Sequence, residues 1–146
     1  MIVLILPYYE TTESVRHFLS VDCAGQDATI IDVTKYEKDQ SLIIIDSAKA
    51  YFGSSLDIMS FIKSLTNYAE KIGKKGVCAL CDMGAFFQYR GVGELIVHEA
   101  SSFPPKFNIN LKAFCLYHKS DYARLTEDQK RELLEHHYGK ELMVTG

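Results

Sequence analysis

Ionisable residues directly follow several short apolar runs in this sequence. Asp46 follows the run Leu42–Ile45, Asp82 follows Val77–Cys81, and His118 closes a third run. Carboxylates and an imidazole can bind the polar groups of a ligand or transfer protons. If the runs are parallel strands, their polar ends meet at one edge of a sheet, where parallel sheets bind ligands. The simpler interpretation of any single Asp is a cap on a turn or a helix.

Aromatic residues cluster around the same positions. The chain has 9 Tyr and 8 Phe but no Trp. A crevice walled by aromatic rings and holding a few carboxylates suits an organic ligand better than a polyanion. The alternative is that the rings belong to the core beneath the loops. The predicted ligand contacts are Asp46, Asp82, Tyr117, His118 and Glu99 for polar groups, with Tyr8, Phe86 and Phe87 as walls.

Glu99 follows His98 on a predicted helix that begins near Val92. We expect one of the two residues to face inward. A buried carboxylate needs a hydrogen-bonding partner. Arg90 and a tyrosine hydroxyl are the candidates for Glu99.

Two motifs are weaker than they look. Cys78 and Cys81 have CxxC spacing, but residues three apart on a strand point to opposite faces, so the thiols should diverge. No second Cys pair lies nearby, and we expect no metal. Ile43–Ser47 resembles the strand that carries the magnesium-associated acid of nucleotide hydrolases, but no glycine-rich loop with lysine follows the first strand. We therefore expect neither ATP hydrolysis nor a cofactor.

The elements that would position these residues alternate between strands and helices. A helical repeat from Leu56 to Ile72, closed by Gly73, lies between two apolar runs and predicts a right-handed βαβ crossover. We predict one domain over residues 1–146, a three-layer α/β fold with a mostly parallel sheet of five to six strands and helices on both faces. Further helices are expected near Thr11–Ser14, from about Val92 and from a capping box at Thr126–Gln129. Ser54-Ser55 are the expected caps of the Leu56–Ile72 helix. The polar link Lys35–Gln40 is expected to be a loop or a tight turn, and Met83–Gly91 a mobile loop. The predicted strands are Ile2–Leu6, Ala28–Val33, Leu42–Ile45, Val77–Cys81, Leu111–Tyr117 and Leu142–Val144, with the direction of Ala28–Val33 left open.

Composition excludes several classes of protein. The 146 residues carry a net charge of −3, and no basic stripe would attract nucleic acid. The apolar runs are too short to span a bilayer, and the start of the chain behaves as a strand and not as a signal peptide. The expected location is the cytoplasm, where the four cysteines would be reduced thiols.

The order of the motifs resembles the MEDS family of sensory domains, which have a RecA/KaiC-like core without its phosphate loop. The residues that carry the resemblance are Tyr8–Thr11, Leu42–Asp46 with Tyr51-Phe52, Gly76–Met83, Glu94–Glu99 and Phe114–His118. The resemblance implies a module that senses a small organic molecule in signal transduction or transcriptional control, with no catalytic residues established. Its signal would pass to a separate output protein or to a second copy of the chain.

Two other classes of protein stay open. An enzyme would use Asp82, Glu99 and His118 as acid–base groups, and their pKa values would be perturbed in one cleft. A non-catalytic interaction module, such as a homodimer, would show a large apolar patch in place of an enclosed pocket.

Overall fold

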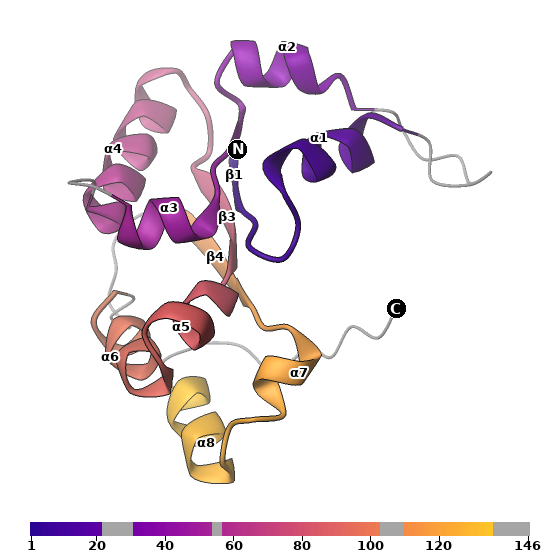
Figure 1. Ribbon diagram of the computed structural model, residues 1–146. Helices are drawn as coiled ribbons and strands as arrows, with labels where there is room; N and C mark the ends of the chain where they lie inside the picture. The colour runs from indigo at the N-terminus through magenta and orange to yellow at the C-terminus, as the bar shows by residue number, and fades with distance from the viewer. Residues whose placement is uncertain (22–30, 54–56, 103–109, 136–146) are drawn as a thin grey trace. The chain divides into compact units, whose positions relative to one another are not determined.

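The computed structural model describes residues 1–21, 31–53, 57–102 and 110–135. The chain divides into two compact units, each built from two segments (Figure 1). We call Met1–Met83 with Ile109–Leu116 the sheet unit, and Gly84–Asn108 with Tyr117–Gly146 the helical unit. Each unit is described by itself.

The sheet unit contains four parallel strands in the order β2-β1-β3-β4. The prediction of a parallel sheet in an α/β fold is confirmed. The predicted number of five to six strands was wrong for the residues that the structure describes, which form four. The predicted strand Leu142–Val144 lies outside the described residues. β2 and β3 lie on opposite sides of β1 in the sheet. The strand order therefore changes direction between β1 and β3, although all four strands run parallel. The strands are β1 (Ile2–Leu6), β2 (Leu42–Ile44), β3 (Val77–Asp82) and β4 (Leu111–Leu116).

Helices cover both faces of this sheet, as the apolar runs predicted. In Figure 1, α1 (Thr12–Ser20) and α2 (Val33–Lys38) lie on one side of the strands, and α3 (Ser47–Phe52) and α4 (Ile58–Lys71) lie on the other. Helix α4 contacts β3. The cluster beneath α1 and α2 consists of Val33, Leu42 and Ile44 with Val3, Ile5, Val15, Leu19 and Ile31. The opposite face of β1 and β3 is almost completely buried through Ile2, Leu4, Leu6, Val77, Ala79 and Cys81.

Strand β4 is less buried than its apolar sequence predicted. Phe114 is 45% exposed and Leu116 is 48% exposed. Both alternate along β4 with partly buried residues. The sheet is therefore closed on both faces over β1 and open to solvent on one face of β4.

Helix α4 begins and ends through well-defined caps. Asp57, and not the predicted Ser54-Ser55, caps its start by accepting a hydrogen bond from the Met59 amide at 3.2 Å. Ser54-Ser55 lie outside the described residues. At the other end, Gly73 has φ +74°, and the amides of Gly73 and Lys74 donate to the carbonyls of Glu70 and Ala69. This Schellman motif is the stop that the position of Gly73 predicted.

The predicted strand Ala28–Val33 was wrong where the structure describes it, and the rest of it lies outside the described residues. Asp32 instead caps α2, accepting from the Lys35 amide at 3.1 Å, and Val33 is the first helical residue. Most of the polar link Lys35–Gln40, which we expected to be a loop or a tight turn, is thus part of the short helix α2. Its buried Val33 belongs to the core over β1 and β2, so packing and the Asp32 cap outweigh the preference of β-branched residues for strands.

The helical unit contains α5 (Gly84–Tyr89), α6 (Val92–Ser102), α7 (Lys119–Tyr122) and α8 (Glu127–Glu135). Helix α6 contacts both α5 and α8. The expectation that Met83–Gly91 is a mobile loop was wrong. Helix α5 occupies most of this segment and buries Phe86 and Phe87. Gly91, at φ +110°, ends this helical turn.

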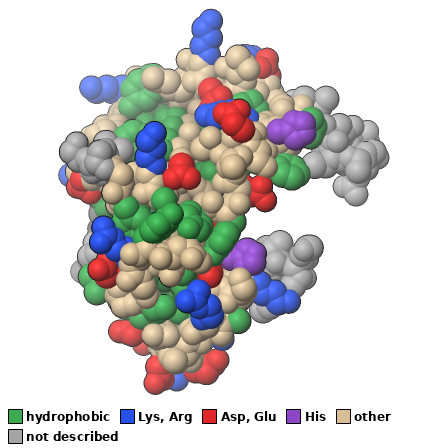
Figure 2. Space-filling view, viewed as in Figure 1, with side chains coloured by type: hydrophobic (Ala, Val, Ile, Leu, Met, Phe, Trp, Pro, Cys, Tyr) green, Lys and Arg blue, Asp and Glu red, His purple; other side chains and the backbone are tan. Residues whose placement is uncertain are grey.

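Helix α8 starts at the predicted capping box. The Thr126 hydroxyl accepts from the Gln129 amide at 3.2 Å, and the Gln129 side chain accepts from the Thr126 amide at 2.9 Å. Acidic side chains gather over this helix in the space-filling view (Figure 2). Within the described ranges, no helix combines the length and the apolar character that crossing a bilayer requires.

Replacing Thr126 with Ala should lower the free energy of unfolding by about 1 kcal/mol, because the start of α8 loses its hydroxyl acceptor. Urea unfolding followed by circular dichroism measures this change. Thr12→Ala is the matched control, since Thr12 is the first residue of α1 and Thr11 provides the cap there. Equal losses in the two variants would contradict a capping role for Thr126.

Candidate functional site

Ser47 joins three strand ends at the carboxyl edge of the sheet. Its amide donates to the Pro7 carbonyl at 2.7 Å, and its hydroxyl donates to the Asp82 carbonyl at 2.7 Å. Pro7 follows β1, Asp82 ends β3, and Ser47 itself begins α3 just after β2. The Ser47 side chain is fully buried. Sequence reasoning missed this residue, because a serine after Asp46 looks like an ordinary helix start.

Asp46 has a structural role at this edge. Its carboxylate accepts from the Lys49 amide at 2.9 Å and so caps α3. This is the simpler of the two interpretations that the sequence offered. The side chain is partly buried, and its hydrogen bond satisfies an otherwise unpaired amide in the first turn of the helix.

Asp82 ends β3, and Tyr8 lies two residues after the end of the neighbouring strand β1. Leu6 pairs with Cys81, so β1 and β3 leave the sheet side by side at Pro7 and Asp82. Tyr8 is partly buried and stacks edge-to-face on Tyr9, with ring centroids 4.9 Å apart. The structure thus brings Tyr8 and Asp82 to the same edge, as predicted.

Glu99 is fully buried in the helical unit and accepts a hydrogen bond from the Tyr117 hydroxyl at 2.7 Å. A tyrosine hydroxyl, one of the two expected partners of Glu99, is confirmed. The guanidinium of Arg90, the other expected partner, lies 3.8 Å from a Glu94 carboxylate oxygen. Tyr117 also contacts the Phe87 ring edge-on, with centroids 6.5 Å apart. These three predicted site residues therefore form one packed cluster.

His118 caps α7. Its Nδ1 lies 3.3 Å from the Ser120 amide nitrogen and accepts from it, so this nitrogen carries no proton in that arrangement. The Ser120 hydroxyl lies 2.7 Å from the same nitrogen. His118 thus shares the helix-capping role found for Asp46.

His98 is partly buried against Phe86, with ring centroids 5.0 Å apart. Burial lowers the pKa of His98, and the neighbouring Glu99 carboxylate offsets part of that effect. A lowered pKa means that the folded unit favours the neutral imidazole.

The predicted site residues divide between the two units. Asp46, Asp82 and Tyr8 belong to the sheet unit, whereas Tyr117, His118, Phe86, Phe87 and Glu99 belong to the helical unit. In the helical unit, Glu99, Tyr117 and Phe87 contact one another, whereas Phe86 packs against His98 and His118 caps α7. Among the residues that the structure describes, no three His, Cys, Asp or Glu side chains are grouped to hold a metal ion.

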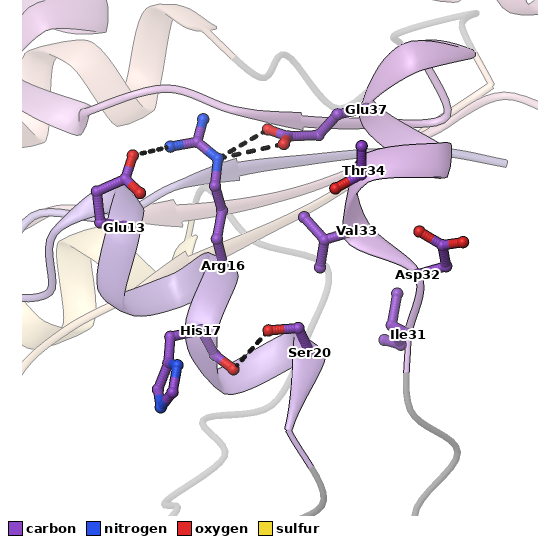
Figure 3. Close-up of a pocket in the computed structure, with 9 residues that line it drawn as sticks. All are labelled: Glu13, Arg16, His17, Ser20, Ile31, Asp32, Val33, Thr34 and Glu37. Atoms are coloured by element: carbon purple, nitrogen blue, oxygen red, sulfur yellow. Dashed lines mark hydrogen bonds and ion pairs between the residues drawn. The ribbon is translucent and has the colours of Figure 1, made fainter.

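An open groove of about 630 Å³ lies between α1 and α2 (Figure 3). Arg16 spans it, with its guanidinium 2.7 Å from a Glu13 carboxylate oxygen and 3.0 Å from one of Glu37. These bonds, the one to Glu37 above all, raise the pKa of Arg16. The groove contains none of the predicted site residues. The three-residue spacing of Glu13 and Arg16 was its one visible signal, since such pairs meet on a helix.

The chain matches no family model, no curated protein and no solved structure. The resemblance to the MEDS family therefore stays a prediction. The functional argument depends on the geometry of the two units alone.

Ser47→Ala should destabilise the protein by about 1–3 kcal/mol, because the Asp82 carbonyl loses the hydroxyl donor that the buried Ser47 provides. Chemical denaturation measures the change. Ser64→Ala is the control, since the exposed Ser64 hydroxyl bonds only to the Ser60 carbonyl within α4 among the described contacts. If Ser47→Ala cost no more than Ser64→Ala, the sheet edge would not depend on Ser47.

His98 should make stability fall as the pH drops below about 6.5, its ordinary pKa. Because its folded pKa is lowered, the unfolded chain binds the proton more readily, and protonation favours unfolding. We expect His98→Gln to reduce the loss of unfolding free energy between pH 7 and pH 5, as measured by urea titration. His17→Gln, at an exposed position on α1, should retain the wild-type pH dependence. Parallel pH curves for wild type and His98→Gln would contradict this assignment.

Proposed function

We propose that this chain is a regulatory domain that binds a small organic molecule at the carboxyl edge of its sheet. The observation that carries the proposal is the strand order β2-β1-β3-β4 with all strands parallel. In such sheets, ligands bind outside the carboxyl ends of the strands where the order reverses. Here that position lies between β1 and β3, beside Tyr8 and Asp82.

The groups at this edge favour a particular ligand chemistry. The Pro7 and Asp82 carbonyls already accept hydrogen bonds from Ser47. The Asp82 carboxylate, at the end of β3, can accept a hydrogen bond from a donor group of the ligand, and the partly buried Tyr8 ring supplies an apolar surface. A neutral or cationic organic molecule fits this pair better than a phosphate ester, because the loop after β1 has no glycine or lysine.

Internal hydrogen bonds favour binding over catalysis. Glu99 is bonded to Tyr117, and His118 caps α7, so these two acid–base candidates have structural roles. The capping role of Asp46 likewise makes it a support of the edge. Phe86 and Phe87 are buried in the helical unit, where they would act through packing.

The proposed sensory role of the domain is taken from its resemblance to the MEDS family. A RecA/KaiC-like core without a phosphate loop, working as a sensor in the cytoplasm, would report its ligand to a separate output protein or through a homodimer. Ligand binding would shift the balance between two conformations of the edge. The capping of α3 by Asp46 and its tie through Ser47 would carry that shift from β3 to the sequence after β2.

The proposal is tested with purified full-length protein. Native mass spectrometry should reveal a retained small molecule, and a thermal-shift screen of neutral and cationic organic compounds should find at least one that stabilises the chain. Absence of both would overturn the proposal.

Asp82→Asn should weaken binding of such a compound by about 10-fold or more, because a hydrogen bond to a charged group contributes about 1.5–3 kcal/mol. Isothermal titration calorimetry measures the affinity. Glu70→Gln, which removes the same charge from an exposed position on α4, should bind like wild type. An unchanged affinity in Asp82→Asn would remove Asp82 from the site.

A further inference from the structure

Cys81 and Cys115 lie directly opposite each other on neighbouring strands of the sheet unit. The register of β3 and β4 pairs their Cα atoms. Side chains of paired residues in a parallel ladder project from the same face of the sheet. Cys78, by contrast, faces the other side of β3, as its CxxC spacing predicted. The sequence motif is thus not a dithiol, but the tertiary structure creates one.

The pairing is fixed at both ends of the two strands. Gly76, just before β3, has φ +142°, and a side chain there would overlap the Asn110 carbonyl oxygen. The Val77 amide donates to that same oxygen at 2.9 Å. At the other end, the Met83 amide donates to the Leu116 carbonyl at 2.9 Å. A slip of one residue would break both contacts and separate the two cysteines.

The spacing of the strands permits a bond between the two sulfurs. Adjacent strands lie about 4.8 Å apart, and disulfides join Cα atoms about 4.4–6.8 Å apart. Cys81 is 1% exposed, whereas Cys115 is partly exposed. An oxidant therefore reaches Cys115 first, and Cys81 lies beside it on the neighbouring strand.

We propose that Cys81 and Cys115 form an oxidation site that a peroxide converts into an intrachain disulfide. The Cys115 thiolate attacks one peroxide oxygen, and the O–O bond breaks to give a sulfenic acid and hydroxide. The Cys81 sulfur then attacks the Cys115 sulfur, its proton leaves with the hydroxyl as water, and the S–S bond forms. The two thiols lose two electrons and two protons, and hydrogen peroxide is reduced to two waters.

The position of the bond gives it a structural consequence. Asp82 and Leu116 follow the two cysteines directly, and the chain passes from the sheet unit to the helical unit just after them. A disulfide would link β3 and β4, which lead into the helical unit, one residue pair before the last pair of their ladder. Thiols of a second molecule could reverse the bond through exchange at the partly exposed Cys115 sulfur. This inference does not depend on the ligand proposed for the sheet edge.

The test uses the full chain treated with hydrogen peroxide under native conditions, then alkylated and digested with trypsin without reduction. We expect a mass loss of about 2 Da before alkylation, from the two hydrogens removed. The tryptic peptide Gly76–Arg90 should be linked to Ala113–Lys119. Because the first peptide contains both Cys78 and Cys81, the digestion is repeated on Cys78→Ser, which should keep the link.

Cys115→Ser should abolish the link completely while the circular dichroism spectrum stays that of wild type. Phenylarsine oxide, which bridges closely spaced thiols, provides a readout that needs no oxidant. Wild type and Cys78→Ser should each bind one equivalent with Cys81 and Cys115 protected from alkylation, and Cys115→Ser should lose that binding. A link through Cys78 or Cys23, a dimer joined between chains, or Cys115 sulfinic acid beside an alkylated Cys81 would overturn the proposal.

Discussion

The carboxyl edge of the sheet depends on the two hydrogen bonds of Ser47. A parallel sheet leaves the last carbonyl groups of its strands without ladder partners, and a buried unpaired carbonyl is costly. Ser47 satisfies two of them at once, one after β1 and one at the end of β3. Because Ser47 also starts α3, the same residue sets where the chain leaves β2. This edge of the sheet, which carries Tyr8 and Asp82, is therefore built around the buried hydroxyl of Ser47.

Polar residues at the ends of the strands serve the fold before they serve a ligand. Asp46 and His118 each satisfy an amide in the first turn of the helix that follows. A short polar side chain at a strand–helix junction is well placed for this role, since its oxygen or nitrogen reaches the amide two or three residues ahead. Asp82 differs in its place in the sheet, because it ends β3 next to the point where the strand order reverses. That position is the physical reason for proposing Asp82 as the ligand contact.

The two sides of the sheet have different chemistry. Around β1, both faces are covered and nearly all side chains are aliphatic. On β4, one face exposes Phe114 and Leu116, and the other carries Cys115 opposite Cys81. Of the two paired cysteines, Cys115 is the one that water and small oxidants can reach, while Cys81 is buried beside it on β3.

The sequence by itself determined the elements whose signals are local. The helix stop at Gly73, the capping box at Thr126 and the apolar strand Ile2–Leu6 were all predicted, because φ preference, capping and apolar runs act over a few residues. Tertiary structure alone decided the rest. Ala28–Val33 failed as a strand where it is described, since Asp32 caps a helix whose Val33 finds its core against β2. Likewise, neither the role of Ser47 nor the pairing of Cys81 with Cys115 was visible, because both join segments more than thirty residues apart, and strand order and register are set by packing between such segments.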